Sequence, residues 1–160
     1  MHISCHGIEK SQGTSLKRED ENRFLLLEDD KGMGTLVSEK TLNSLITKMM
    51  PDLELVFVAA CQSEFVGSIF KKCGASHVVC VKQSKHVLDE AAIHFTNSFY
   101  KHIFSQVKVC EAYEFAKKEV EFKFKKHESD LFTLMTKDDH CCVQFAKREK
   151  GKLECLTHHV

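Results

Sequence analysis

Two residues of this 160-residue chain have the types and positions needed for nucleophilic catalysis. His6 follows a short apolar segment at residues 1–5, and Cys61 follows a nearly all-apolar segment at residues 53–60. In parallel α/β sheets, functional groups collect where the strands end. If these segments are parallel neighbours, His6 can take the thiol proton of Cys61 or stabilise the thiolate, which is the attacking species.

Backbone groups near these two residues would assist the same chemistry. The amides of Gly7 and Cys61 are candidates for an oxyanion hole, and a glycine lets a substrate carbonyl approach closely. A helix beginning near Glu64 would direct its positive N-terminal end toward the thiol and favour the thiolate. The sequence therefore predicts a cysteine nucleophile, a histidine partner and a backbone anion site at one sheet edge.

The remaining sequence predicts the elements that must position these groups. Short apolar runs predict strands at residues 1–5, 24–27, 53–60, 77–81, 131–136 and 141–146. Helical spacing of apolar residues predicts helices between Ser38 and Pro51, between about Glu64 and Gly74, and over residues 88–103 and 112–120. Because strands and helices alternate, we expect one α/β domain over residues 1–160 with a mostly parallel sheet. The last two strands, joined through residues 137–139, would form a C-terminal β-hairpin.

Composition argues against several classes of function. Basic and acidic residues number 23 each, so the chain lacks the basic excess of a nucleic-acid-binding protein. The charged run at residues 111–128 is typical of a solvated helix face. No apolar run approaches the roughly 18 residues of a membrane span, and no signal peptide is visible. We expect no nucleic-acid partner and no membrane partner.

The eight cysteines make up too small a share of the chain for a secreted disulfide scaffold. Most of them lie in apolar segments, where a reduced cysteine packs as a small hydrophobic residue. We therefore expect a cytoplasmic protein in which all eight cysteines are reduced thiols.

A zinc site is the other candidate for chemistry. Residues 140–142 and 155–159 contain enough histidines and cysteines, but they lack a C-x₂-C pair, and adjacent cysteines on a strand point to opposite faces. His2, Cys5 and His6 also cluster in sequence, although neighbouring positions on one strand do not easily converge on one ion. We expect no metal and no cofactor.

The order and spacing of two short motifs resemble the caspase-type cysteine peptidases. His6-Gly7 follows one strand and Ala60-Cys61-Gln62-Ser63 follows another, with 55 positions between the histidine and the cysteine. The second motif is closer to the CHAT branch of this clan, whose caspase-like domains are often attached to tetratricopeptide repeats. Residues 70–79 and the segment beginning at Asp89 resemble later steps of that branch, so the resemblance covers about residues 2–120.

This resemblance implies a caspase-like three-layer sandwich and a peptidase acting on a protein or peptide substrate. His6 would be the base or orienter, Cys61 the nucleophile, Gly7 an oxyanion-hole donor, and Asp89 part of a pocket for basic residues. It also implies a tetratricopeptide-repeat partner or a flanking region. The family's first strands, which normally precede the histidine strand, are absent here, and Gln62 departs from the acidic residue found before serine in many relatives.

Each candidate residue also has a simpler interpretation. Cys61 is then a buried thiol, His6 a polar residue at a strand end, and Asp89 a carboxylate that complements the dipole of a helix. A second hypothesis is a catalytically inactive CHAT module that acts as a protein-interaction or signalling scaffold. An incomplete sheet favours it, because an exposed strand edge pairs readily with another chain.

Overall fold

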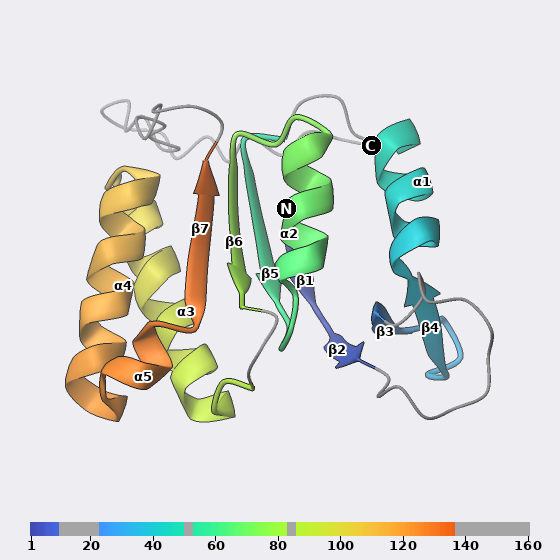
Figure 1. Cartoon of the computed structure of the whole chain (residues 1–160). Coiled ribbons are helices and arrows are strands. Elements are labelled where there is room, and N and C mark those ends of the chain that lie inside the picture. The colour runs from blue at the N-terminus through green and yellow to red at the C-terminus, as the bar shows by residue number, and fades with distance from the viewer. Residues whose placement is uncertain (10–22, 50–52, 83–85, 137–160) are drawn as a thin grey trace.

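The computed structural model describes residues 1–9, 23–49, 53–82 and 86–136. These residues form seven strands and five helices (Figure 1). In chain order the elements are β1 (His2–Ser4), β2 (His6–Glu9), β3 (Arg23–Glu28), β4 (Gly34–Ser38), α1 (Glu39–Met49), β5 (Leu55–Ala59), α2 (Glu64–Lys72), β6 (His77–Val81), α3 (Asp89–Phe104), α4 (Val109–Phe124), α5 (Lys126–Ser129) and β7 (Phe132–Thr136).

A four-stranded, mostly parallel sheet forms the centre of the fold. Its strand order is β1-β5-β6-β7, in which β1, β5 and β6 run parallel and β7 pairs antiparallel with β6. All five residues of β6 are buried, as expected for an apolar strand that is covered on both faces. The predicted α/β class and the mostly parallel sheet are confirmed.

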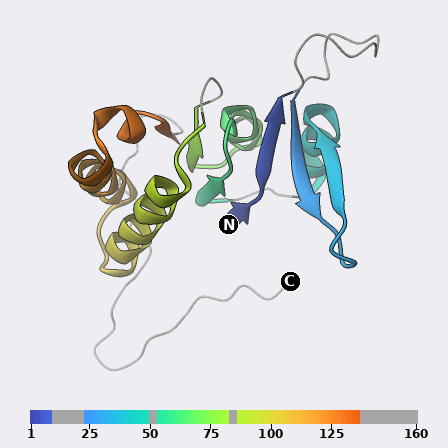
Figure 2. The ribbon, with the colours of Figure 1, turned by 90° about the horizontal axis from the view of Figure 1, so that it is seen from below.

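Alternate residues of the central strands enter two separate cores. Phe57 and Val79 pack with α3 and α4, whereas Val56 and Val78 pack with α1 and α2. This follows from the two-residue period of a strand, which directs successive side chains to opposite faces. Figure 2 shows helices on both sides of the sheet, so each of the two cores lies between the sheet and helices on one of its faces.

The second sheet is antiparallel, has the order β2-β3-β4, and was only partly predicted. The sequence indicates its middle strand, β3, but not β2 or β4. Most of β4 is exposed, so it lacks the alternation of apolar and polar residues that marks a half-buried strand. The turn between β3 and β4 positions this strand instead. In that turn the amides of Lys31 and Met33 donate to the Asp29 carboxylate, and Gly32 has a φ of 75°.

Two helix boundaries expected from the sequence agree with the observed contacts, whereas α4 extends beyond the expected residues 112–120 at both ends and α5 was not expected. Ser38 caps α1, because its hydroxyl oxygen accepts the amide of Thr41 at 3.2 Å. Gly74 follows α2 with a φ of 103°, which suits glycine at that position. Strand β7 matches the first strand of the expected C-terminal hairpin, while residues 137–146 lie outside the described residues.

The cysteines differ in state. Cys5, Cys61, Cys73 and Cys80 are free thiols, whereas Cys110 in α4 is disulfide-bonded. The prediction of eight reduced cysteines is therefore wrong at Cys110, because a disulfide depends on two sulfur atoms that the fold brings together and not on composition. Among the described residues, no helix has both the length and the apolar character needed to cross a membrane.

Ser63 fixes the turn between β5 and α2, which carries Cys61. Its side chain is fully buried; the hydroxyl donates to the carbonyl of Val58 at 3.4 Å and accepts the amide of Val81 at 3.0 Å. One hydroxyl thus satisfies backbone groups of two neighbouring strands at the end of the sheet where the chain leaves toward α2.

Replacing Ser63 with alanine should lower the free energy of unfolding by about 1–3 kcal/mol, because the buried amide of Val81 loses its acceptor. Urea denaturation followed by circular dichroism measures this change. Ser68→Ala is the matched control: the Ser68 hydroxyl donates only to the carbonyl of Glu64 within the same helix. Equal effects of the two substitutions would contradict the bridging role of Ser63.

Candidate active site

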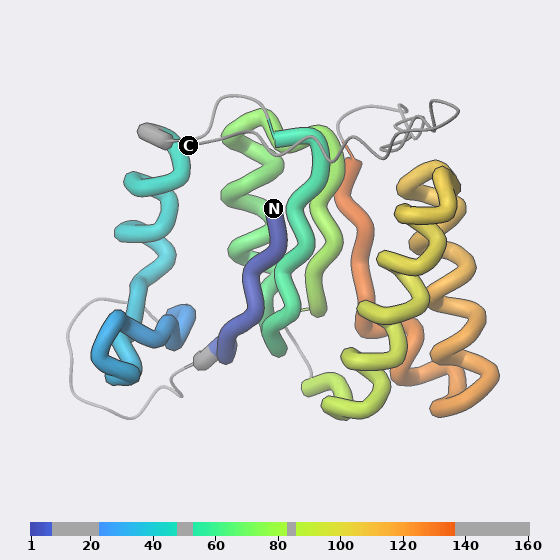
Figure 3. The backbone as a smooth tube through the Cα atoms, turned by 180° about the vertical axis from the view of Figure 1, so that it is seen from behind, coloured from blue at the N-terminus to red at the C-terminus, as the bar shows by residue number. Residues whose placement is uncertain are grey.

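The strand register brings His6 and Cys61 to the same end of the sheet. In the parallel pair of β1 and β5, Ser4 lies opposite Ala59, and the amide of Cys5 donates to the Ala59 carbonyl at 3.4 Å. His6 and Cys61 each follow this last registered pair by two residues. The prediction that their strands are parallel neighbours is confirmed, and Figure 3 shows β1 beside β5 with the chain continuing toward the second sheet.

All three predicted side chains line one cavity of about 790 Å³. His6 reaches it from the start of β2, Cys61 from the turn after β5, and Asp89 from the first turn of α3. His6 and Asp89 are exposed, and Cys61 is half-buried. The cavity is therefore bordered by residues that carry an imidazole, a thiol and a carboxylate.

One face of α3 lines this cavity. The α3 residues that line it are Asp89, Ala92, Ile93, Thr96 and Asn97. They recur at the three- and four-residue spacing that places side chains on one side of a helix. Residues of β1 and β3 also line the cavity.

Gly7 and Cys61 are in direct backbone contact. A Cβ atom added to Gly7 would lie 1.8 Å from the carbonyl oxygen of Cys61 and 3.0 Å from its carbonyl carbon. Only a residue without a side chain permits this approach. The sequence predicts a role for Gly7 in binding a substrate oxyanion; the contact with the Cys61 carbonyl is an additional, structural requirement for glycine.

The turn that presents Cys61 is tight. Gln62 has a φ of 53°, in the left-handed region that costs a non-glycine residue about 1–2 kcal/mol. The surrounding contacts must hold this conformation, and both the Ser63 bridge and the Gly7 contact act within one residue of Gln62. No sequence signal identifies this strained residue, because glutamine rarely adopts such a backbone conformation.

The Cys61 thiol has a backbone partner that the sequence analysis missed. Its Sγ donates to the carbonyl of Val87 at 4.0 Å, in the segment that precedes α3. The neighbouring thiol of Cys5 has a different environment, since burial raises its pKa to about 11 and keeps it protonated. Although both sulfurs line the cavity, Cys5 is a poor competitor as a nucleophile.

His2 is a second histidine in the cavity wall, and it has its own partners. Its Nδ1 lies 2.8 Å from the hydroxyl of Tyr100, and its ring stacks on Phe57 with a centroid distance of 5.1 Å. Partial burial lowers the pKa of His2, which favours the neutral ring.

Of the two groups of residues that could bind a metal, only one lies in the described part of the chain. No group of three or more His, Cys, Asp or Glu side chains in the described part of the chain is arranged to hold a metal ion, so His2, Cys5 and His6 do not form such a cluster there. The other considered group, at residues 140–142 and 155–159, lies outside the described residues.

Replacing Gly7 with alanine should lower the free energy of unfolding by about 3 kcal/mol, because the new methyl group meets backbone that cannot rotate away. Gly34→Ala is the matched control in the same sheet, where the added methyl would meet the flexible end of the Leu26 side chain at 2.9 Å. Urea denaturation of both variants gives the comparison. A smaller loss for Gly7→Ala than for Gly34→Ala would contradict a fixed contact with Cys61.

The strand register and the cavity together define a candidate thiol–imidazole site. A fold of this class hosts many activities, so function follows from the site and not from the architecture. Compared with known proteins, the chain matches no protein-family model and no curated protein.

Proposed function

We propose that this protein is a cysteine peptidase of the caspase-like CHAT type, with Cys61 as nucleophile and His6 as its partner. The observation that carries the proposal is the shared cavity, which places His6, Cys61 and Asp89 around one space at the end of two parallel strands. A thiol and an imidazole on one accessible cavity are the minimum set for acyl transfer through a thioester.

In the proposed reaction, His6 takes the proton of the Cys61 thiol and the thiolate attacks the carbonyl carbon of a peptide bond. The carbonyl oxygen becomes an oxyanion, which the amides of Gly7 and Cys61 stabilise. Collapse of this intermediate breaks the C–N bond, and the imidazolium of His6 returns its proton to the leaving amine. Water, deprotonated by His6, then attacks the thioester and releases the acid product and the thiol.

The thiol must leave the Val87 carbonyl before it reacts. Because a thiol is a weak hydrogen-bond donor and the S–O distance is 4.0 Å, exchanging this partner for His6 costs little. The half-buried position of Cys61 keeps the sulfur beside the cavity during this change.

Replacing Cys61 with alanine should abolish hydrolysis, and replacing His6 with alanine should lower kcat about 10²- to 10⁴-fold by removing the general base. A panel of fluorogenic peptides measures both rates. Cys73→Ala is the matched control, because Cys73 is also a free, half-buried thiol but does not line the cavity. Activity that survives Cys61→Ala would remove the dyad from consideration.

Asp89 is proposed to select basic residues at the cleaved position. Its carboxylate is exposed in the first turn of α3 and lines the same cavity as Cys61. A guanidinium or ammonium group of the substrate would pair with this negative charge.

We expect Asp89→Asn to raise KM for arginyl substrates about tenfold, while substrates with a neutral residue at that position keep their rates. Glu90→Gln controls for the helix dipole, since Glu90 is an exposed carboxylate in the same turn that does not line the cavity. Equal losses in both variants would assign Asp89 to helix stability alone.

A second candidate function is a protein-interaction scaffold. Within the described residues, β1 pairs with β5 on one side only, so its other edge offers backbone donors and acceptors to an added strand. Under this alternative, Cys61→Ala leaves the affinity for a partner protein unchanged, whereas under the first proposal it abolishes peptide hydrolysis.

A further inference from the structure

We infer that Glu128 is a positioning residue for Cys61, because it holds residues 87–89 in the place where the Val87 carbonyl accepts the thiol proton. This inference rests on the proposed function for its significance, since it describes how the nucleophile is held before reaction. Residues 87–89 are called the 87–89 segment below.

The carboxylate of Glu128 is unusually well buried for its type. Its residue is 5% exposed, and its Oε2 accepts the amide of Leu88 at 3.1 Å. Its other oxygen, Oε1, lies 3.1 Å from Nε2 of His127. Burying a carboxylate is unfavourable unless its oxygens are partnered, and here one partner is the backbone of the 87–89 segment.

Each residue of the 87–89 segment has a different contact. The carbonyl of Val87 accepts the Cys61 thiol, the amide of Leu88 donates to Glu128, and Asp89 lines the cavity. Leu88 is also the N-cap residue of α3 and supplies no side-chain cap of its own. Glu128 therefore provides, from a distant element, a side-chain acceptor for the N-cap amide of this helix.

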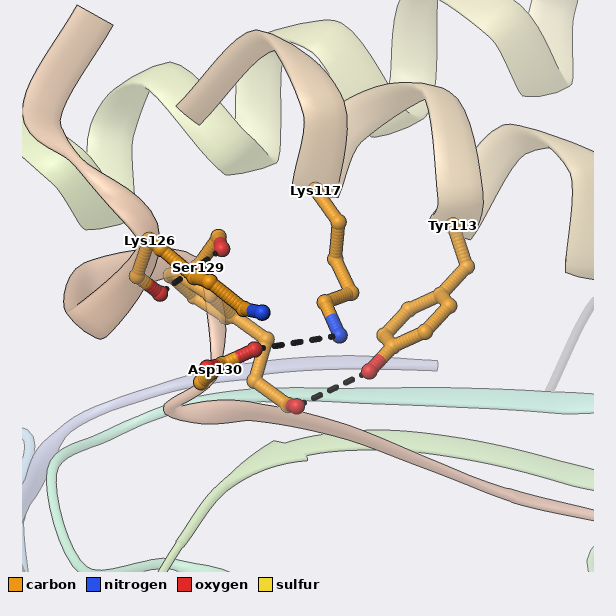
Figure 4. Close-up of polar contacts among 6 residues, drawn as sticks. Tyr113, Lys117, Lys126, Ser129 and Asp130 are labelled. Atoms are coloured by element: carbon orange, nitrogen blue, oxygen red, sulfur yellow. Dashed lines mark hydrogen bonds and ion pairs between the residues drawn. The ribbon is translucent and has the colours of Figure 1, made fainter. Parts of the chain in front are cut away.

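Glu128 belongs to α5, and polar contacts of the residues around it with α4 are drawn in Figure 4. The hydroxyl of Ser129 donates to the Lys126 carbonyl at 2.9 Å within α5. The hydroxyl of Tyr113 donates to the carbonyl of Phe132 at 2.8 Å, and Lys117 forms an ion pair with Asp130 at 3.7 Å. The last two contacts attach the end of α5 and the start of β7 to α4. They therefore restrain the position of the backbone that carries the Glu128 carboxylate.

The chemical consequence concerns the proton on Cys61. A carbonyl oxygen accepts a hydrogen bond from the protonated thiol. It repels a thiolate, because both atoms are electron-rich. If the 87–89 segment moves away, the protonated thiol loses this stabilisation. Electrophiles that require the thiolate should then react faster at Cys61.

The test is the rate of alkylation of Cys61 by iodoacetamide at pH 7, followed in the full chain by mass spectrometry of the Cys61 peptide. Glu128→Ala should raise this rate about two- to fivefold, the factor that corresponds to one weak hydrogen bond. Glu128→Gln retains an oxygen that can accept the Leu88 amide and should restore the original rate.

A second variant removes the same contact without altering Glu128. Leu88 has a φ of −63°, which proline adopts, and proline has no amide proton, so Leu88→Pro should reproduce the effect of Glu128→Ala. His127→Ala leaves the Leu88 contact in place and should not change the rate.

The alkylation rate of Cys73, a free thiol outside the cavity, reports general loosening of the fold and should stay constant in every variant. Unchanged Cys61 rates in both Glu128→Ala and Leu88→Pro would overturn the inference, as would a parallel rise at Cys73. Alkylation needs no turnover, so a protein without peptidase activity that still shows the Glu128 effect would overturn only the proposed function.

Discussion

The contact between the Gly7 backbone and the Cys61 carbonyl is the constraint on which the rest of the site depends. It joins the antiparallel sheet, which begins with His6, to the end of a parallel strand 55 positions later. The strand register brings the two segments together, but register alone leaves their separation free. The missing side chain of Gly7 lets the two backbone segments meet, so one hydrogen atom in place of a methyl group sets the spacing between them.

Two further sets of contacts hold the turn that carries the thiol, in which Gln62 adopts a left-handed backbone. Ser63 attaches its C-terminal side to β5 and β6, and the Val87 carbonyl restrains the sulfur. Each of these contacts has a backbone group as one of its partners. The candidate site is therefore defined more by main-chain position than by side-chain chemistry.

The sequence predicted those features that have a local signature. Apolar runs located β5 and β6, and a cap serine located the start of α1. The small second sheet was largely missed, because β4 is mostly exposed and has no apolar period. The residues at strand ends pointed to His6 and Cys61, whereas Val87 and Glu128 have no local signature and act through contacts between distant segments.

The pairing of β1 with β5 also bears on the order of events during folding. Ile3 and Val58 are registered neighbours although 55 positions separate them, so closing this loop costs chain entropy before any contact compensates for it. The long helices α3 and α4 need only local closure and can form earlier. We therefore expect the segments that carry His6 and Cys61 to come together late in folding, after the long helices have formed.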